Sequence, residues 1–289
     1  MAGERQIKRR IKSAKNISQI TKAMQMVAAS RMKKAQDAAL FGKPYRQKIN
    51  ETVVRLSQGV DKSLHPLLRD DDKLEGKTLN ILISTNKGLC GGLNTNLFRA
   101  VQRLFLEKEN IDYLTMGKKG ESFIVRTKKN LVADFSSDNF LTDVPAVIAF
   151  CADGFLREEY KTVNLIFNEF INSLKQLPAV RRLLPIGVLA ATQKEEIVES
   201  RENRREFLIE PSAPELLNSL LPHYLEIQLR NAILESLASE FSARMIAMKN
   251  ATDNASSLIS DLTLVYNQLR QQRITYEIAD IVTASIGIN

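Results

Sequence analysis

The 289-residue sequence has no tryptophan, only two cysteines and only two histidines, and this scarcity limits the chemistry it can support. Cys90 and Cys151 are too few and too far apart for a disulfide framework, and His65 and His223 complete no cluster with zinc-site spacing. No apolar run reaches the roughly 18–20 residues of a membrane span, and the N-terminal region is charged from Glu4 onward. We therefore expect neither secretion nor membrane insertion, and a reducing, cytosol-facing compartment.

Glycine and proline are absent from residues 223–286, and the apolar residues there recur at alternating steps of four and three. The positions on this spacing are Ile227, Asn231, Leu234, Ala238, Phe241, Met245, Met248, Thr252, Ala255, Ile259, Leu262, Tyr266 and Leu269. Such spacing is typical of a coiled-coil seam, so we predict one helix, roughly 95 Å long at about 1.5 Å per residue. A helix of this length must project from a globular domain, and its apolar stripe needs a matching stripe on another helix.

Residues 4–41 also lack glycine and proline, and they carry a second apolar stripe. Its members are Ile7, Ile11, Ala14, Ile17, Ile20, Met24, Val27 and Ala28. We predict a second long helix, in which Gly42 and Pro44 interrupt the pattern, Pro44 is a candidate for a kink, and residues 45–57 are helical again. These two end helices carry the only long complementary stripes, so we predict that they form an antiparallel two-helix coiled coil.

Between the end helices, short apolar runs alternate with helical patterns, as in a small α/β sheet. Strands are predicted at 79–84, 111–116, 131–134, 163–170 and 183–189, and helices at 95–107, 120–126 and 144–160. The predicted fold class is α/β with long terminal helices, in which the coiled coil carries an inserted Rossmann-like α/β domain. The segments are a coiled-coil helix at 1–58, a linker at 59–76, the α/β domain at 77–192, a linker at 193–213 and a coiled-coil helix at 214–289.

Positive charge is concentrated at the N-terminal end. Residues 1–48 contain 13 Lys or Arg against Glu4 and Asp37, a net charge of +11, whereas the whole chain carries +8. Such a segment is either a solvated helix face or a surface for an acidic partner, protein or nucleic acid. Residues 1–40 contain no Phe, Tyr or Trp, so they lack the aromatic stacking platform of many nucleic-acid-binding proteins.

A Gly-rich loop, residues 86–92, follows the first predicted strand and precedes a helix, which is where phosphate-binding loops occur. Its spacing matches neither a dinucleotide fingerprint nor a Walker A loop, so we favour a tight turn. Cys90 has no histidine near it in sequence, so no base is evident that could activate its thiol. Glu158 and Glu159, which are neighbours in sequence, lie in a charged surface context and give no signal of acid–base catalysis. We expect no catalytic, cofactor-binding or metal-binding residue.

With these features in hand, nearly the whole chain resembles the gamma-subunit family of the F-type, proton-translocating ATP synthase, of the bacterial type. The segments that carry the resemblance, in chain order, are 20–30 (ITKAMQMVAAS), 88–94 (GLCGGLN), 251–255 (ATDNA) and 274–277 (ITYE), the last followed by Asp280. Residues 86–87 (NK) and 284–285 (AS) depart from the family pattern, but both lie outside the seam.

The resemblance implies a non-catalytic central rotor stalk, which couples rotation of a proton-driven c-ring to ATP synthesis or hydrolysis at catalytic beta subunits. The shaft would stand in a ring of three alpha and three beta subunits, and the α/β domain would contact the epsilon subunit and the c-ring. The resemblance further implies no cofactor. The expected location is peripheral, on the cytoplasmic face of the bacterial plasma (inner) membrane, with no direct membrane insertion.

The resemblance also implies residue roles. A catch that hydrogen-bonds loops of the ring would consist of Arg270, Gln271, Thr275 and Glu277, and an apolar bearing of Ile278, Ile281, Val282 and Ile286. Met24 and the basic residues Lys8, Arg9, Arg10, Lys12 and Lys15 would face acidic segments of beta. Two alternatives stay open: a basic coiled-coil protein that binds nucleic acid, and an α/β nucleotide-binding enzyme with its ligand at residues 88–92.

Overall fold

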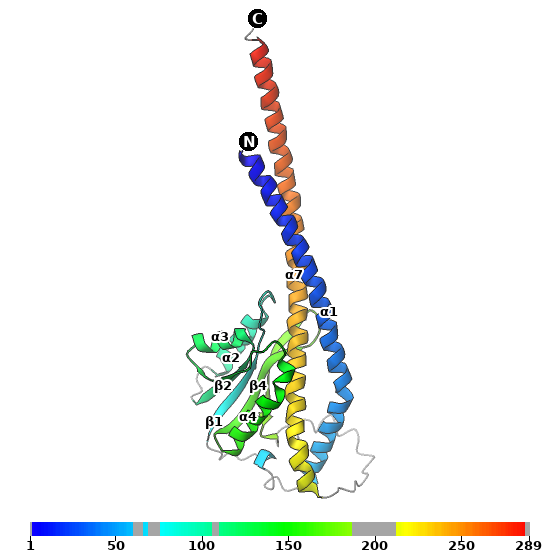
Figure 1. Cartoon of the computed structure of the whole chain (residues 1–289), viewed down its shortest axis with the longest axis vertical. Coiled ribbons are helices and arrows are strands. Elements are labelled where there is room, and N and C mark those ends of the chain that lie inside the picture. Colours follow the sequence, from blue (N-terminus) through cyan, green and yellow to red (C-terminus); the bar gives the residue numbers. More distant parts are fainter. Residues whose placement is uncertain (1, 60–65, 69–75, 106–109, 187–211, 287–289) are drawn as a thin grey trace. The chain divides into compact units, whose positions relative to one another are not determined.

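The computed structural model of the chain describes residues 2–59, 66–68, 76–105, 110–186 and 212–286. The residues cluster into two compact units: unit 1 comprises Met1–Ser30 and Arg244–Asn289, and unit 2 comprises Arg31–Ala243. Two long helices, α1 (Ala2–Gly59) and α7 (Ala213–Ile286), contribute to both units (Figure 1). None of the helices in the described segments combines the length and the apolarity that a bilayer crossing requires.

Unit 2 contains a five-stranded sheet in the order β3-β2-β1-β4-β5. The strands are β1 (Lys77–Ile83), β2 (Ile111–Met116), β3 (Asn130–Asp134), β4 (Tyr160–Phe170) and β5 (Gln176–Leu184). Strands β1 to β4 run parallel to one another, whereas β5 pairs with β4 antiparallel. The central strand β1 is buried from Leu79 to Ile83, as expected for a parallel strand covered on both faces.

Helices cover both faces of this sheet. On one face, α2 (Leu93–Phe105) and α3 (Lys118–Arg126) pack over Leu82, Tyr113 and Ile166. On the other face, α4 (Val144–Leu156) and the unit 2 portions of α1 and α7 enclose the larger core, together with the short 3-10 helices η2 (Pro66–Leu68) and η3 (Phe140–Thr142) (Figure 1). Unit 2 is therefore a three-layer α/β domain, and this confirms the predicted fold class.

The first half of α7 enters this core through four leucines spaced four residues apart. Leu217, Leu221, Leu225 and Leu229 are all fully buried. Residues four apart lie on one helical face, so the leucines form a single stripe against the sheet. Leu67 and Leu68 of η2 are buried in the same core, so this part of the predicted 59–76 linker is packed; most of that linker, and nearly all of the 193–213 linker, lie outside the described residues.

Two predicted boundaries in the sheet domain are wrong. The last strand is Gln176–Leu184, not 183–189, and residues 187–189 lie outside the described part of the chain. Pro178 and the charged Arg181 mask its strand pattern, but pairing with β4 stabilises it, and an edge strand tolerates proline. The helix predicted to reach residue 160 ends at Leu156, because Tyr160 is buried as the first residue of β4.

The first helix, predicted at 1–58 with a break in its pattern at Gly42 and Pro44, is one continuous helix with Pro44 inside it. Proline removes one helical hydrogen bond and normally kinks or ends a helix. Here the residues that follow it contact α7 within unit 2: Tyr45 Oη lies 2.6 Å from His223 Nε2, and Arg46 donates to Asn231. These tertiary contacts support the helix through the proline.

Candidate functional site

In unit 1, α1 and α7 pack antiparallel along a seam of buried and half-buried residues. On the α7 side the seam consists of Met248, Thr252, Ala255, Ile259, Leu262, Tyr266, Leu269 and Arg273. Apart from Ala251, no other residue of α7 between 248 and 282 is buried or half-buried. The predicted seam is thus confirmed from Met248 to Leu269, and it continues by one further step of four to Arg273.

The α1 side of the seam differs from the prediction. Ile17, Ile20 and Val27 were expected to face the partner helix, but each is more than half exposed. Ser18 and Thr21 are half-buried in their place. The buried alanines Ala14, Ala28 and Ala255 keep the seam narrow, and small side chains allow two helices to approach closely. The exposed isoleucines and Val27 form, with half-buried Met24, a second stripe on α1.

A pair of threonines fixes which face of α1 meets α7. Thr21 Oγ1 lies 2.7 Å from Thr252 Oγ1, and each hydroxyl also contacts a carbonyl of its own helix. Each hydroxyl can donate its one proton to a backbone carbonyl one turn away and use its oxygen to accept the proton of the other threonine. Either threonine can therefore be the donor across the seam. This polar contact sets the register of the two helices and explains why the isoleucines beside Thr21 turn outward.

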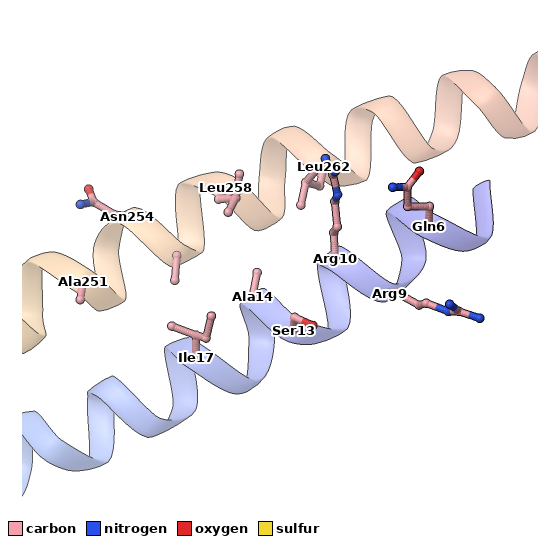
Figure 2. Close-up of a pocket in the computed structure, with 11 residues that line it drawn as sticks. Gln6, Arg9, Arg10, Ser13, Ala14, Ile17, Ala251, Asn254, Leu258 and Leu262 are labelled. Carbon is pink, nitrogen blue, oxygen red and sulfur yellow. The ribbon is translucent and has the colours of Figure 1, made fainter. Parts of the chain in front are cut away.

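A groove of about 580 Å³ opens between α1 and α7 in unit 1 (Figure 2). Its lining is mainly apolar and includes Ile17, Leu258 and Leu262. Figure 2 shows that Arg10 points toward α7 beside Leu262, whereas Arg9 points away from that helix. The groove therefore combines an apolar floor with cationic edges, which suits a partner surface that is both apolar and acidic.

The residues assigned to the catch lie on neighbouring turns of α7, beyond most of the seam. Arg270, Gln271, Thr275 and Glu277 are all exposed. Thr275 Oγ1 donates to the backbone oxygen of Gln271 at 3.0 Å, and Glu277 Oε1 lies 3.3 Å from Arg273 Nε. The structure thus brings the four residues together on one helix, with polar ends available to a partner.

The bearing and the basic face are also exposed. Ile278, Ile281 and Val282 are 56%, 69% and 49% exposed, and the side chain of Ile286 lies outside the described residues. The basic residues Lys8, Arg9, Arg10, Lys12 and Lys15 are all exposed on α1. Apolar side chains at this exposure, grouped at one helix end, are typical of a surface that another protein covers.

One site residue was missed from the sequence. Arg273 Nη1 lies 2.6 Å from Glu4 Oε2, so the first turn of α1 is ion-paired to α7. Continuing the steps of four and three past Leu269 would have placed Arg273 on the seam, and counting back from Ile7 would have placed Glu4 there. A basic and an acidic residue at facing seam positions are the signal that could have found this pair.

The Gly-rich loop uses its polar groups inside unit 2. Asn86 Nδ2 donates to the Ser137 carbonyl at 2.7 Å, and Asn86 Oδ1 accepts from the backbone N–H of Lys118 at 3.1 Å. Asn94 Nδ2 donates to Thr85 Oγ1 at 2.7 Å. These bonds join the ends of β1 and β2 to the following segments, so the geometry is that of a structural turn.

No group of His, Cys, Asp and Glu side chains suited to a metal ion occurs in the described segments. Burial raises the pKa of the Cys151 thiol to about 12, which keeps it protonated and unreactive at neutral pH. Burial also raises the pKa of Glu235, although Arg181 and the hydrogen bond from Asn231 oppose the shift. Glu235 lies among cationic partners on α1 and β5, 4.0 Å from Arg46 and 3.9 Å from Arg181, so its perturbation has a structural cause.

Comparisons with known proteins cover the whole chain. A family model described as ATP synthase matches residues 3–286. The ATP synthase gamma chain of Methylacidiphilum infernorum is 43% identical over 296 residues, which cover 100% of both chains. Neither of these two matches points to nucleic-acid binding.

Two solved structures are similar to the fold. A chain from the central stalk and c-ring structure of the Tetrahymena thermophila mitochondrial ATP synthase matches with a TM-score of 0.57 and 28% identity, covering 80% of this chain and 99% of that one. A chain from the rotor of the Euglena gracilis mitochondrial ATP synthase matches with a TM-score of 0.63, covering 94% and 99%; at 18% identity it supports the fold alone.

Proposed function

Because this chain belongs to the ATP synthase gamma-chain family, we propose that it is the central stalk of a rotary, proton-driven ATP synthase. The observation that carries the proposal is the end of α7, which continues past its seam with α1 as a helix whose apolar residues Ile278, Ile281 and Val282 are exposed. Such a helix end requires an apolar collar. A ring of three alpha and three beta subunits would supply it.

The chain acts as an asymmetric shaft and catalyses nothing itself. Three chemically identical sites on beta can differ only if something touches them differently, and a two-helix shaft in the centre of the ring does so. As the shaft turns, its contacts move from one beta subunit to the next, and each site changes its affinity for nucleotide in sequence. The energy transmitted is limited by the difference in contact energy between orientations, since equal contacts would shift no equilibrium.

The catch residues and the bearing residues of α7 have different roles. Arg270, Gln271, Thr275 and Glu277 present polar groups to loops of the ring, and such hydrogen bonds must break and re-form in each turn. Charge-assisted hydrogen bonds are directional and strong, so they define preferred stopping angles. The bearing residues make apolar contacts that are not directional, and these resist rotation less.

The N-terminal segment supplies the contacts with beta. Lys8, Arg9 and Lys12 are exposed, and Met24 lies half-buried beside the exposed Ile20 and Val27. Acidic segments of beta would pass the basic residues, while the apolar stripe around Met24 would meet the ring at closer range. The density of positive charge in residues 1–48 supports an acidic partner.

Unit 2 holds the remaining partners. We propose that its α/β domain contacts the epsilon subunit and the c-ring, and that the chain is held peripherally at the cytoplasmic face of a bacterial inner membrane by these partners. The bacterial source of the similar gamma chain supports this location. No cofactor is required for the shaft to act.

Observation of rotation tests the proposal. Leu174 is 84% exposed, whereas Cys90 and Cys151 are buried, so Leu174→Cys provides one reactive thiol for a bead. The labelled chain, assembled with alpha, beta and epsilon and fixed through the ring, should rotate in one direction when ATP is added. A ring assembled without this chain is the control. ATP hydrolysis by the complete assembly without any bead rotation would overturn the proposal.

A further inference from the structure

We infer that Arg273 is a two-sided clamp: it fastens the start of α1 to α7 through Glu4, and it holds the catch residue Glu277 in place. The contact with Glu4 is a property of unit 1 by itself. The importance of holding Glu277 rests on the proposed function, because only there does Glu277 belong to a catch. These two parts can therefore be tested separately.

The geometry of the three side chains is that of a shared ion pair. Arg273 Nη1 donates to Glu4 Oε2 at 2.6 Å, whereas Nε lies 3.3 Å from Glu277 Oε1 as an ion pair without hydrogen-bond geometry. Side-chain exposure rises from 15% for Glu4 to 42% for Arg273 and 62% for Glu277. Glu4 is thus the most enclosed charge of the three, and a carboxylate enclosed to this degree depends on its cationic partner.

The position of Arg273 explains why an arginine stands on an otherwise mostly apolar seam. From the Thr21–Thr252 contact, 17 residues back along α1 lead to Glu4, and 17 residues forward along α7 lead to Leu269. Arg273 follows one turn later, where α1 is about to begin and offers little apolar surface. Figure 1 shows α7 continuing past the start of α1. A long side chain that reaches back to the first turn closes the seam at this point.

The guanidinium group is suited to both contacts at once. Its planar fork donates from Nη1 to the Glu4 carboxylate while Nε stays within ion-pair distance of Glu277, whereas the ammonium of lysine is a single point charge. Glu4 also lies in the first turn of α1, where a negative charge is favoured by the unpaired N–H groups of the helix. The hydrogen bond to Glu4 therefore fixes the plane of the guanidinium, and that plane keeps its positive charge beside the Glu277 carboxylate.

Arg273 is consequently a positioning residue for the catch. It limits the side-chain orientations of Glu277 before any loop of the ring approaches, so less freedom is lost when the catch engages. It also partly neutralises the Glu277 carboxylate. Loss of Arg273 should then change how long the shaft dwells at its preferred angle, even though Arg273 acts through its neighbour.

Hydrogen exchange in the full-length chain tests the contact with Glu4. The first four amides of a helix lack intrahelical acceptors, so the readout is exchange at residues 6–12. Glu4→Gln and Arg273→Gln should each accelerate exchange there by at least about fivefold, and the double variant should match the single ones, because the pair acts as a unit. Arg5→Gln, at an exposed neighbouring position, is the matched control. Unchanged exchange in both variants, or equal acceleration in the control, would overturn the clamp.

Rotation of the assembled complex tests the hold on Glu277. Arg273→Lys should keep the slow exchange of residues 6–12, because lysine can still pair with Glu4, but should alter the dwell of the shaft as Arg273→Gln does. A lysine variant with an unaltered dwell would overturn the positioning role. If Glu277→Gln itself leaves the dwell unchanged, the catch in the proposed function fails, while the exchange result still decides the clamp.

Discussion

The two halves of α7 put the same kind of apolar residue to different uses. In unit 2, its leucines at steps of four, such as Leu221 and Leu225, are fully buried against a sheet. In unit 1, the steps alternate between four and three, and many apolar residues outside the seam, such as Leu258 and Ile281, are about half exposed or more. The first half of α7 is thus committed to a core, whereas the second half keeps apolar surface for another protein.

This difference separates stability from function along a single helix. A fully buried leucine contributes through the area it removes from water and through the cavity its loss would create. An exposed leucine contributes little to the folded chain, and a group of exposed apolar residues along one helix is typical of a surface that another protein covers. Variants in the first half should therefore damage folding, and variants in the second half should damage assembly or coupling.

The largest expected effect comes from truncating one leucine in each half. Leu225→Ala should lower the free energy of unfolding by about 2–5 kcal/mol, because it leaves a cavity in the core of unit 2. Leu258→Ala should change it by no more than about 0.5 kcal/mol. Urea unfolding followed by circular dichroism measures both. Similar losses in the two variants would remove the distinction between the halves.

A smaller effect is expected at the threonine pair of the seam. Thr252→Val keeps the shape of the side chain but leaves Thr21 without its partner across the seam, at a cost of about 0.5–1.5 kcal/mol. The double variant with Thr21→Val should recover most of the loss, because the seam then contains no hydroxyl that lacks its partner from the other helix. Melting of the wild type and of both variants provides the measurement, and a double variant no better than Thr252→Val would contradict the pairing of the two hydroxyls across the seam.

Met24→Lys probes the ring-facing side of unit 1. A lysine here would form an ion pair with an acidic loop of beta worth about 1 kcal/mol, which would lengthen one dwell about fivefold and lower coupling efficiency. Proton pumping per ATP hydrolysed, in membranes carrying the assembled complex, reports coupling. The free variant chain should melt as the wild type does, and unaltered coupling would count against the proposed position of Met24.

The smallest effect concerns Glu235, which belongs to the first half of α7, in unit 2. Burial raises its pKa in the folded chain, so the folded chain binds the proton more tightly than the unfolded chain does. Stability should then fall as pH rises from the unfolded value of about 4.3 through the raised value. Glu235→Gln should lack this fall, which urea midpoints across that range would reveal; parallel pH curves for both chains would contradict it.

Sequence patterns predicted those elements whose own residues decide which face is buried. The strand Ile111–Met116 was predicted residue for residue because its apolar residues, which include Tyr113 on one face and Leu114 on the other, can fill both faces of a covered sheet. The α7 seam was predicted from Met248 to Leu269 because its spacing already specifies one stripe. Strand β5 was misplaced because pairing with β4, and not its own pattern, makes Gln176–Leu184 a strand.

The candidate site likewise has features that the sequence pattern could predict and features that it could not. The exposure of Ile17 and Ile20 could not be read from spacing, since both fit an apolar stripe as well as Thr21 does; the partner helix decides. Arg273 and Glu4 are 269 residues apart, and their contact depends on a register that only the folded seam supplies. The roles of catch and bearing stay predictions, because they depend on partners of the chain.

The threonine pair also has a consequence for synthesis of the chain. Thr21 and Thr252 are separated by 231 residues, so at about 5–20 residues per second the ribosome needs roughly 10–50 s to deliver the second after the first. During that interval the start of the nascent α1 has no partner helix. The positive charge concentrated in residues 1–48 and the lack of aromatic residues before Phe41 suit this interval, because they oppose aggregation with other nascent chains until the last helix emerges.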